Sequence, residues 1–173
     1  MQPPGYIDQY PLRFVLGSTL LSLSIYAIGV FIIYQVGLIW LLLYLLYIII
    51  LEVRLLGNSC INCYYYGKTC AFGKGRLSCL LFKKGDPHKF SQKTITWVDI
   101  LPDFLVFIVP MLVGIALLIG NFSLSLLILV IALLILGGPG NGMVRGQLAC
   151  KYCKQREIGC PAEHLFGGNR KGR

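Results

Sequence analysis

Residues 14–51 read FVLGSTLLSLSIYAIGVFIIYQVGLIWLLLYLLYIIIL and contain no Asp, Glu, Lys, Arg or His. A second stretch without these residues covers 104–144. Each stretch is almost twice as long as the roughly 20 residues that one helical crossing of a bilayer needs. Each also contains a turn signal, at Gln35-Val36-Gly37 and at Gly120-Asn121. The sequence therefore predicts two helical hairpins, formed by helices at about 14–34 with 37–56 and at about 98–119 with 122–140.

The composition supports a membrane protein. The chain has 173 residues, of which 56% are hydrophobic and only 13% are charged. A soluble domain of this size has too little interior to bury so much apolar surface. We therefore expect an all-α membrane protein with four transmembrane helices and the lipid bilayer as its main partner. The formal net charge of +9 could attract nucleic acid, but no nucleic-acid-binding motif accompanies it, so no specific nucleic-acid partner is predicted.

The basic residues predict the orientation. All sixteen Lys and Arg fall on one side of the four helices, and the two turns on the other side have none. Because cytoplasmic loops of membrane proteins are enriched in Lys and Arg, both termini and the 57–96 loop are expected in the cytoplasm. The predicted location is the cell membrane, with several crossings. Tyrosines near this side are expected at the membrane interface, where amphipathic aromatic rings gather: Tyr6, Tyr10, Tyr64, Tyr65 and Tyr66.

The interiors of the predicted helices lack ionisable groups, which argues against a proton-coupled pump. Small residues there, such as Ser18, Gly29 and Gly114, are expected to be close contacts between helices. The glycine-rich run 137–142 predicts a frayed exit from the fourth helix. The run 74–84, which mixes Leu, Phe and Lys, fits either an interfacial helix or a buried segment of the following module.

The chain contains an internal duplication. Cys60-x2-Cys63-x6-Cys70 and Cys150-x2-Cys153-x6-Cys160 have identical spacing. An Asp-x-x-Pro element precedes each hairpin, at Asp8 and at Asp99, where the carboxylate is expected to cap the helix that follows. The predicted fold is thus two duplicated hairpins, each followed by a cytoplasmic cysteine module, related by a pseudo-two-fold along the membrane normal. The two repeats are 1–96 (hairpin about 14–56, cysteine-rich loop 57–96) and 97–173 (hairpin about 98–140, cysteine-rich tail 141–173).

The cysteine triplets are candidate metal ligands. Two thiolates separated by two residues chelate one ion, and zinc takes four thiolates or three thiolates and one imidazole. Two zinc sites are preferred. The first would use Cys60, Cys63 and Cys70 with Cys79 or His88, and the second would use Cys150, Cys153, Cys160 and His164. In an alternative arrangement, Cys60, Cys63, Cys150 and Cys153 hold one ion and leave Cys70 and Cys160 outside it.

Three functional classes remain open on these residues. The first is a non-enzymatic membrane protein whose zinc module is a structural platform that docks a cytoplasmic protein. The second is a membrane redox protein that uses an iron–sulfur cluster or dithiols for electron transfer. The third is a soft-metal handling protein, which would need exchangeable thiolates. The sequence contains no Ser/His/Asp set, carboxylate pair or dinucleotide fingerprint, so it favours the first class over an enzyme.

Overall fold

The computed structural model of the chain describes residues 5–92 and 96–160. Four helices in these ranges are long and apolar enough to cross a membrane. They are Leu12–Tyr34, Leu38–Asn62, Val98–Gly120 and Leu124–Tyr152. The predicted set of four apolar helices is confirmed, and the protein is a multi-pass membrane protein.

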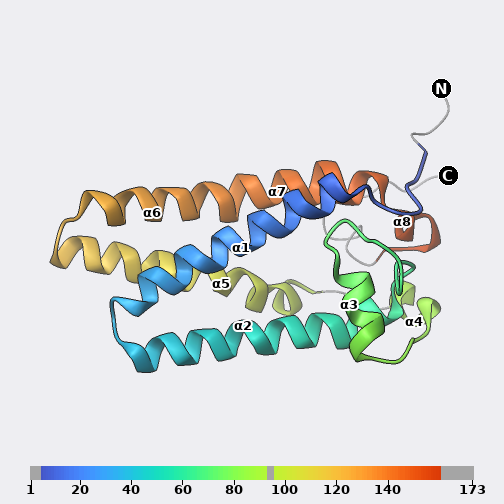
Figure 1. Cartoon of the computed structure of the whole chain (residues 1–173), viewed down its shortest axis with the longest axis horizontal. Helices are drawn as coiled ribbons and strands as arrows, with labels where there is room; N and C mark the ends of the chain where they lie inside the picture. The colour runs from blue at the N-terminus through green and yellow to red at the C-terminus, as the bar shows by residue number, and fades with distance from the viewer. Residues whose placement is uncertain (1–4, 93–95, 161–173) are drawn as a thin grey trace.

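The helices form two antiparallel hairpins (Figure 1). Helices α1 (Leu12–Tyr34) and α2 (Leu38–Asn58) make the first, and α5 (Trp97–Gly120) and α6 (Leu124–Ile135) make the second. Both connecting turns lie at one end of the bundle and fall where the sequence predicted them. The short elements gather at the other end, which we call the cysteine end. They are η1 (Cys60–Asn62), α3 (Lys74–Leu81), α4 (Pro87–Gln92), η4 (Cys150–Tyr152) and α8 (Gln155–Ile158).

The fourth helix does not end in the glycine-rich run, so the prediction of a frayed exit near residue 140 is wrong. It continues from α6 through the π-helical turn η2 (Leu136–Gly140), α7 (Asn141–Met143) and a second π-helical segment, η3 (Val144–Ala149). Pro139 lacks an N–H, and its ring would collide with the carbonyl four residues earlier in a regular helix. A wider π turn accommodates the proline. The helix therefore carries the second cysteine pair on its own end.

Helix α1 lies at the centre of the packing and contacts α2, α5 and α6. The core consists of Ile25, Ile32, Leu126, Val130 and Leu133. Two glycines allow close approaches between helices, as predicted. A Cβ at Gly29 would lie 2.3 Å from the Tyr44 hydroxyl, and one at Gly114 would lie 2.6 Å from a methyl group of Val130. These positions act as small interhelical contacts of the kind that membrane bundles use.

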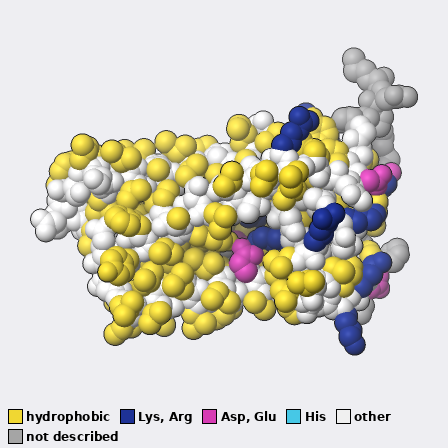
Figure 2. All heavy atoms as spheres, viewed as in Figure 1, with side chains coloured by type: hydrophobic (Ala, Val, Ile, Leu, Met, Phe, Trp, Pro, Cys, Tyr) yellow, Lys and Arg dark blue, Asp and Glu magenta, His cyan; other side chains and the backbone are white. Residues whose placement is uncertain are grey.

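The outer surface of the bundle is apolar (Figure 2). Hydrophobic side chains cover the visible face of the helices, whereas Lys and Arg side chains occur toward the cysteine end. Exposed side chains on α2 include Ile39, at 74% exposed, and Trp40, at 60%. A soluble protein would not present such a continuous apolar surface to water. This surface fits contact with lipid.

The two Asp-x-x-Pro elements differ in structure. Asp99 caps its helix as predicted, because its carboxylate accepts hydrogen bonds from the Thr96 amide at 2.9 Å and the Thr96 hydroxyl at 2.8 Å. Asp8 does not cap α1, whose N-cap residue is Pro11. Its carboxylate instead binds Lys154 at 2.6 Å and the Tyr64 hydroxyl at 2.7 Å. The Asp-x-x-Pro element at Asp8 thus belongs to the cysteine end.

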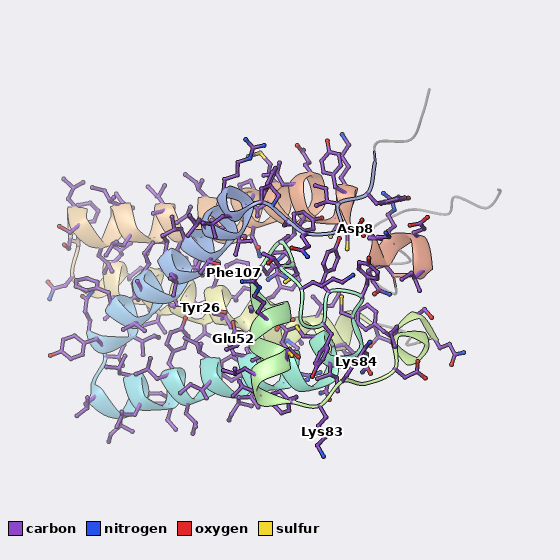
Figure 3. The ribbon with its side chains drawn as sticks, turned by 45° about the vertical axis from the view of Figure 1, so that its right-hand side comes forward. Asp8, Tyr26, Glu52, Lys83, Lys84 and Phe107 are labelled. Carbon is purple, nitrogen blue, oxygen red and sulfur yellow. The ribbon has the colours of Figure 1, made fainter. Side chains whose placement is uncertain are left out.

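The run 74–84 has features of both predicted arrangements. Its helix, α3, packs closely on one side, where a Cβ at Gly75 would overlap the carbonyl oxygens of Tyr65 and Lys68. On the other side Leu80 is 83% exposed. Lys83, just after the helix, points away from the molecule (Figure 3). The helix therefore joins the module to a surface suited to the membrane interface.

We expect Gly114→Ala to destabilise the bundle by about 1–3 kcal/mol, since the new methyl group overpacks a tight interface. Gly17→Ala is the matched control, because a Cβ there meets nothing within 4 Å. Thermal unfolding in detergent, followed by circular dichroism, measures both. Equal melting temperatures for the two variants would show that α5 and α6 do not approach as closely as described.

Candidate metal centre

Each cysteine pair lies in a 3-10 turn at the C-terminal end of a membrane helix. The first turn, η1, follows α2, and the second, η4, follows η3. The Cys63 amide donates to the Cys60 carbonyl at 3.3 Å, and the Cys153 amide donates to the Cys150 carbonyl at 3.3 Å. The two pairs therefore adopt the same local backbone.

The two turns exchange a pair of hydrogen bonds. The amide after Cys63, that of Tyr64, donates to the side-chain oxygen of Gln155 at 2.7 Å. The amide after Cys153, that of Lys154, donates to the hydroxyl of Tyr65 at 3.0 Å. The two accepting side chains are only 1% and 2% exposed. In each turn the residue after the cysteine is the donor and the next residue supplies the acceptor, so we call this pair the reciprocal hydrogen bonds.

A small hydrophobic core fills the space around the two turns. Its buried members are Tyr10, Tyr65, Ala71 and Ala149. Three cysteines, Cys63, Cys70 and Cys153, pack against it. The core therefore contains cysteines from both triplets. Tyr10 and Tyr65 are buried inside it and do not present their rings to the surroundings.

The segment before α1 connects the two turns. Ile7 pairs with Cys153 in a short parallel bridge, and its amide donates to Tyr152 at 3.0 Å. Its carbonyl accepts a hydrogen bond from the Tyr65 hydroxyl. Asp8, labelled at the cysteine end in Figure 3, holds Lys154. The Lys154 ammonium, followed by the Tyr64 hydroxyl, keeps the pKa of Asp8 below its usual range.

Burial and mutual repulsion raise the pKa values of the thiols. Burial, together with the charges of Cys60, Cys70 and Cys160, raises the pKa of Cys63 to about 11. Burial also raises the pKa of Cys153 to about 12, with added repulsion from Cys63, Cys160 and Cys150. These interactions link all six cysteines of the two triplets. A cation bound among these cysteines would offset both the burial of the charged thiolates and the repulsion between them.

The other predicted ligands lie elsewhere. Cys79 is exposed, and the Tyr66 hydroxyl donates its hydrogen bond to the Phe82 carbonyl at 2.7 Å. The His88 side chain and the whole of His164 fall outside the described part of the chain. All seven cysteines lie within it, and none forms a disulfide there. In the same ranges, no three His, Cys, Asp or Glu side chains already surround one position suited to a metal ion.

No protein-family model, curated protein or solved structure matches this chain.

Sequence reasoning missed Tyr65 and Gln155, which hold the two turns together. The only available signal was position, because each residue occurs two places after the second cysteine of its triplet. The residue types differ between the copies, so similarity of side chains could not reveal the shared role.

A polar junction fixes the cysteine end to the helices. The Glu52 carboxylate of α2 accepts from the Tyr26 hydroxyl of α1 at 2.7 Å and pairs with the Lys74 ammonium of α3 at 2.7 Å. Figure 3 shows Tyr26 and Glu52 directed toward each other. Asp103 and Arg145 line the same small cavity, of about 60 Å³. Three elements are thus joined at one carboxylate.

Removing the Tyr65 hydroxyl should loosen the opposite turn. In Tyr65→Phe the Lys154 amide loses its partner, which costs about 1–3 kcal/mol when the group is buried. Hydrogen exchange should become faster in 150–160. Gln155→Leu should have the reciprocal effect on 60–66, because Tyr64 loses its acceptor. Tyr6→Phe is the control, and faster exchange confined to the mutated turn itself would contradict the reciprocal contact.

Lys74→Met should destabilise the protein by about 1.5–3 kcal/mol, because it removes a hydrogen bond between charged groups. Lys83→Met, on the exposed side of the same segment, should leave the melting temperature unchanged. Thermal unfolding in detergent compares the two variants. If both melted at the same temperature, the Glu52 pair would not anchor the module.

Proposed function

We propose that this protein is a structural membrane protein whose two cysteine triplets form a zinc–thiolate centre on the cytoplasmic side of the bilayer. The centre would hold the cytoplasmic ends of the two hairpins in a fixed arrangement and present a rigid basic surface to a protein partner. The reciprocal hydrogen bonds carry the proposal, because they hold two cysteine turns that are distant in sequence against each other.

The same bonds support an internal duplication of hairpin and cysteine module. Cys63 and Cys153 are 90 residues apart. In both turns the next residue donates a reciprocal hydrogen bond through its amide, and the residue after that accepts one through its side chain. Matching spacing could arise by chance within two short segments. Matching spacing combined with exchanged contacts is the arrangement expected when two copies of one unit pack around a pseudo-two-fold.

The placement of the turns favours a metal ion over redox-active thiols. Helix C-termini carry partial negative charge, which stabilises cations and disfavours thiolates. Both cysteine pairs lie at the C-terminal ends of membrane helices. Reactive cysteines have lowered pKa values and often lie at helix N-termini. A bound divalent cation would compensate the negative charge of the helix ends and of the thiolates together.

Several thiolates around one centre suit zinc, which accepts all-sulfur coordination and has no redox chemistry. Binding would require the thiol side chains to turn toward a common point while the backbone hydrogen bonds remain. Structural zinc contributes about 10–16 kcal/mol of apparent binding energy in small peptides. That is enough to order the loops that cover the cysteine end.

The basic residues support the cytoplasmic orientation and the nature of the partner. The described Lys and Arg residues occur at the cysteine end, while the two opposite turns, at 35–37 and 121–123, have none. This asymmetry is the one found on the cytoplasmic side of membrane proteins. A rigid surface of this charge would complement an acidic protein surface.

The test is metal analysis of the protein purified without oxygen, together with its visible spectrum. We expect colourless protein with stoichiometric zinc. A chelator should increase hydrogen exchange in 57–80 and 150–160 while helical circular dichroism stays constant. Brown protein with bound iron would replace the zinc centre by the iron–sulfur alternative. Metal-free protein whose thiols form disulfides under mild oxidation would support dithiol redox chemistry instead.

A further inference from the structure

We propose that the protein binds one anionic phospholipid in a groove between α1 and the end of the fourth helix. An acyl chain occupies the groove, and the phosphate pairs with Arg13. The groove is a cavity of about 330 Å³, which is within the size range of ligand sites. Apart from Arg13 and Ser18, the residues that line it are apolar. No cysteine is among the described residues that line it, so the site is independent of the proposed metal centre.

The groove opens on the apolar outer surface of the bundle. Gly17 is exposed, and a Cβ there would meet nothing within 4 Å. Leu148, from the opposite wall, is also exposed. Gly17 lies four residues after Arg13 and three before the exposed Leu20, so the three residues share one face of α1. Both walls belong to membrane-spanning helices, so the surrounding solvent is lipid, and an apolar groove there takes up a hydrocarbon chain rather than water.

Arg13 supplies a positive charge at the cysteine end of the groove. It is the second residue of α1, and its guanidinium carbon lies 5.5 Å from the centroid of the Phe14 ring, which also lines the groove. Within the described residues, ion pairs are formed by Arg54, Lys74 and Lys154 but not by Arg13. A guanidinium forms paired hydrogen bonds with phosphate oxygens. An apolar groove that ends at such a cation matches the two parts of an anionic phospholipid.

The inner wall of the groove belongs to the cysteine end. Ser18 is buried, and its hydroxyl donates a hydrogen bond to the carbonyl of Ala71. Ala71 and Ala149 line the groove and are buried members of the small core around the cysteine turns. They directly adjoin Cys70 and Cys150 in the chain. A bound acyl chain would therefore cover this core, and the phospholipid would stabilise the cysteine end.

The first test uses the unmodified full chain, stripped of lipid in detergent. Native mass spectrometry counts the lipids that stay bound after addition of phosphatidylglycerol or of phosphatidylcholine with the same acyl chains. We expect one phosphatidylglycerol per chain, bound about fivefold more tightly than phosphatidylcholine, because one cationic contact favours the anionic lipid by about that factor. Equal affinities for the two lipids would overturn the role of charge. Displacement of the lipid by inorganic phosphate would overturn the lipid site in favour of a site for free anions.

Variants separate the two parts of the site. Arg13→Gln should weaken phosphatidylglycerol binding about fivefold and remove the preference over phosphatidylcholine, whereas Lys83→Gln should preserve both. Gly17→Leu fills the groove and should weaken the binding of both lipids. Gly142→Leu is its control, because Gly142 lies outside the groove and a Cβ there also meets nothing within 4 Å. Undiminished binding in Gly17→Leu would overturn the groove, and equal losses in Arg13→Gln and Lys83→Gln would overturn the place of the phosphate.

Discussion

The reciprocal hydrogen bonds between the two cysteine turns are the contact on which the cysteine end depends. Tyr65 and Gln155 are buried polar side chains, and each accepts a hydrogen bond from a backbone amide of the opposite turn. A buried amide without a partner is costly, so neither turn satisfies its backbone without the other. The contact therefore couples the end of α2 to the end of the fourth helix. It also brings together two cysteine turns that the chain separates by a complete helical hairpin.

The membrane helices and the cysteine end support one another. Lipid solvates the apolar outer surface of the helices but offers no hydrogen-bond partners to irregular backbone. The polar turns consequently lie beyond the helices, where Glu52 joins α1, α2 and α3 and the segment before α1 pairs with Cys153. The π turn at Pro139 lets the fourth helix reach this region without a break. A metal centre there would fix the relative positions of both hairpins.

The helices could be predicted from the sequence because membrane crossing depends on length and apolar composition. The turns at Gly37 and Asn121, and the tight contacts at Gly29 and Gly114, followed from local residue type. The continuation past Pro139 could not be predicted, because the glycine-rich run suggests a break and the π turn depends on tertiary packing. The roles of Tyr10 and Asp8 were missed for a similar reason. Both belong to long-range contacts, whereas local rules assign tyrosine to the interface and aspartate to a helix cap. The spacing of the cysteines identified the candidate site but not the partner turn across it.

X-ray absorption at the zinc edge of the purified protein reports which atoms surround the metal. If the two turns close around zinc, the first shell contains sulfur atoms alone, at about 2.3 Å. A shell that contains nitrogen or oxygen would contradict it, because the two triplets would then not meet in one thiolate centre.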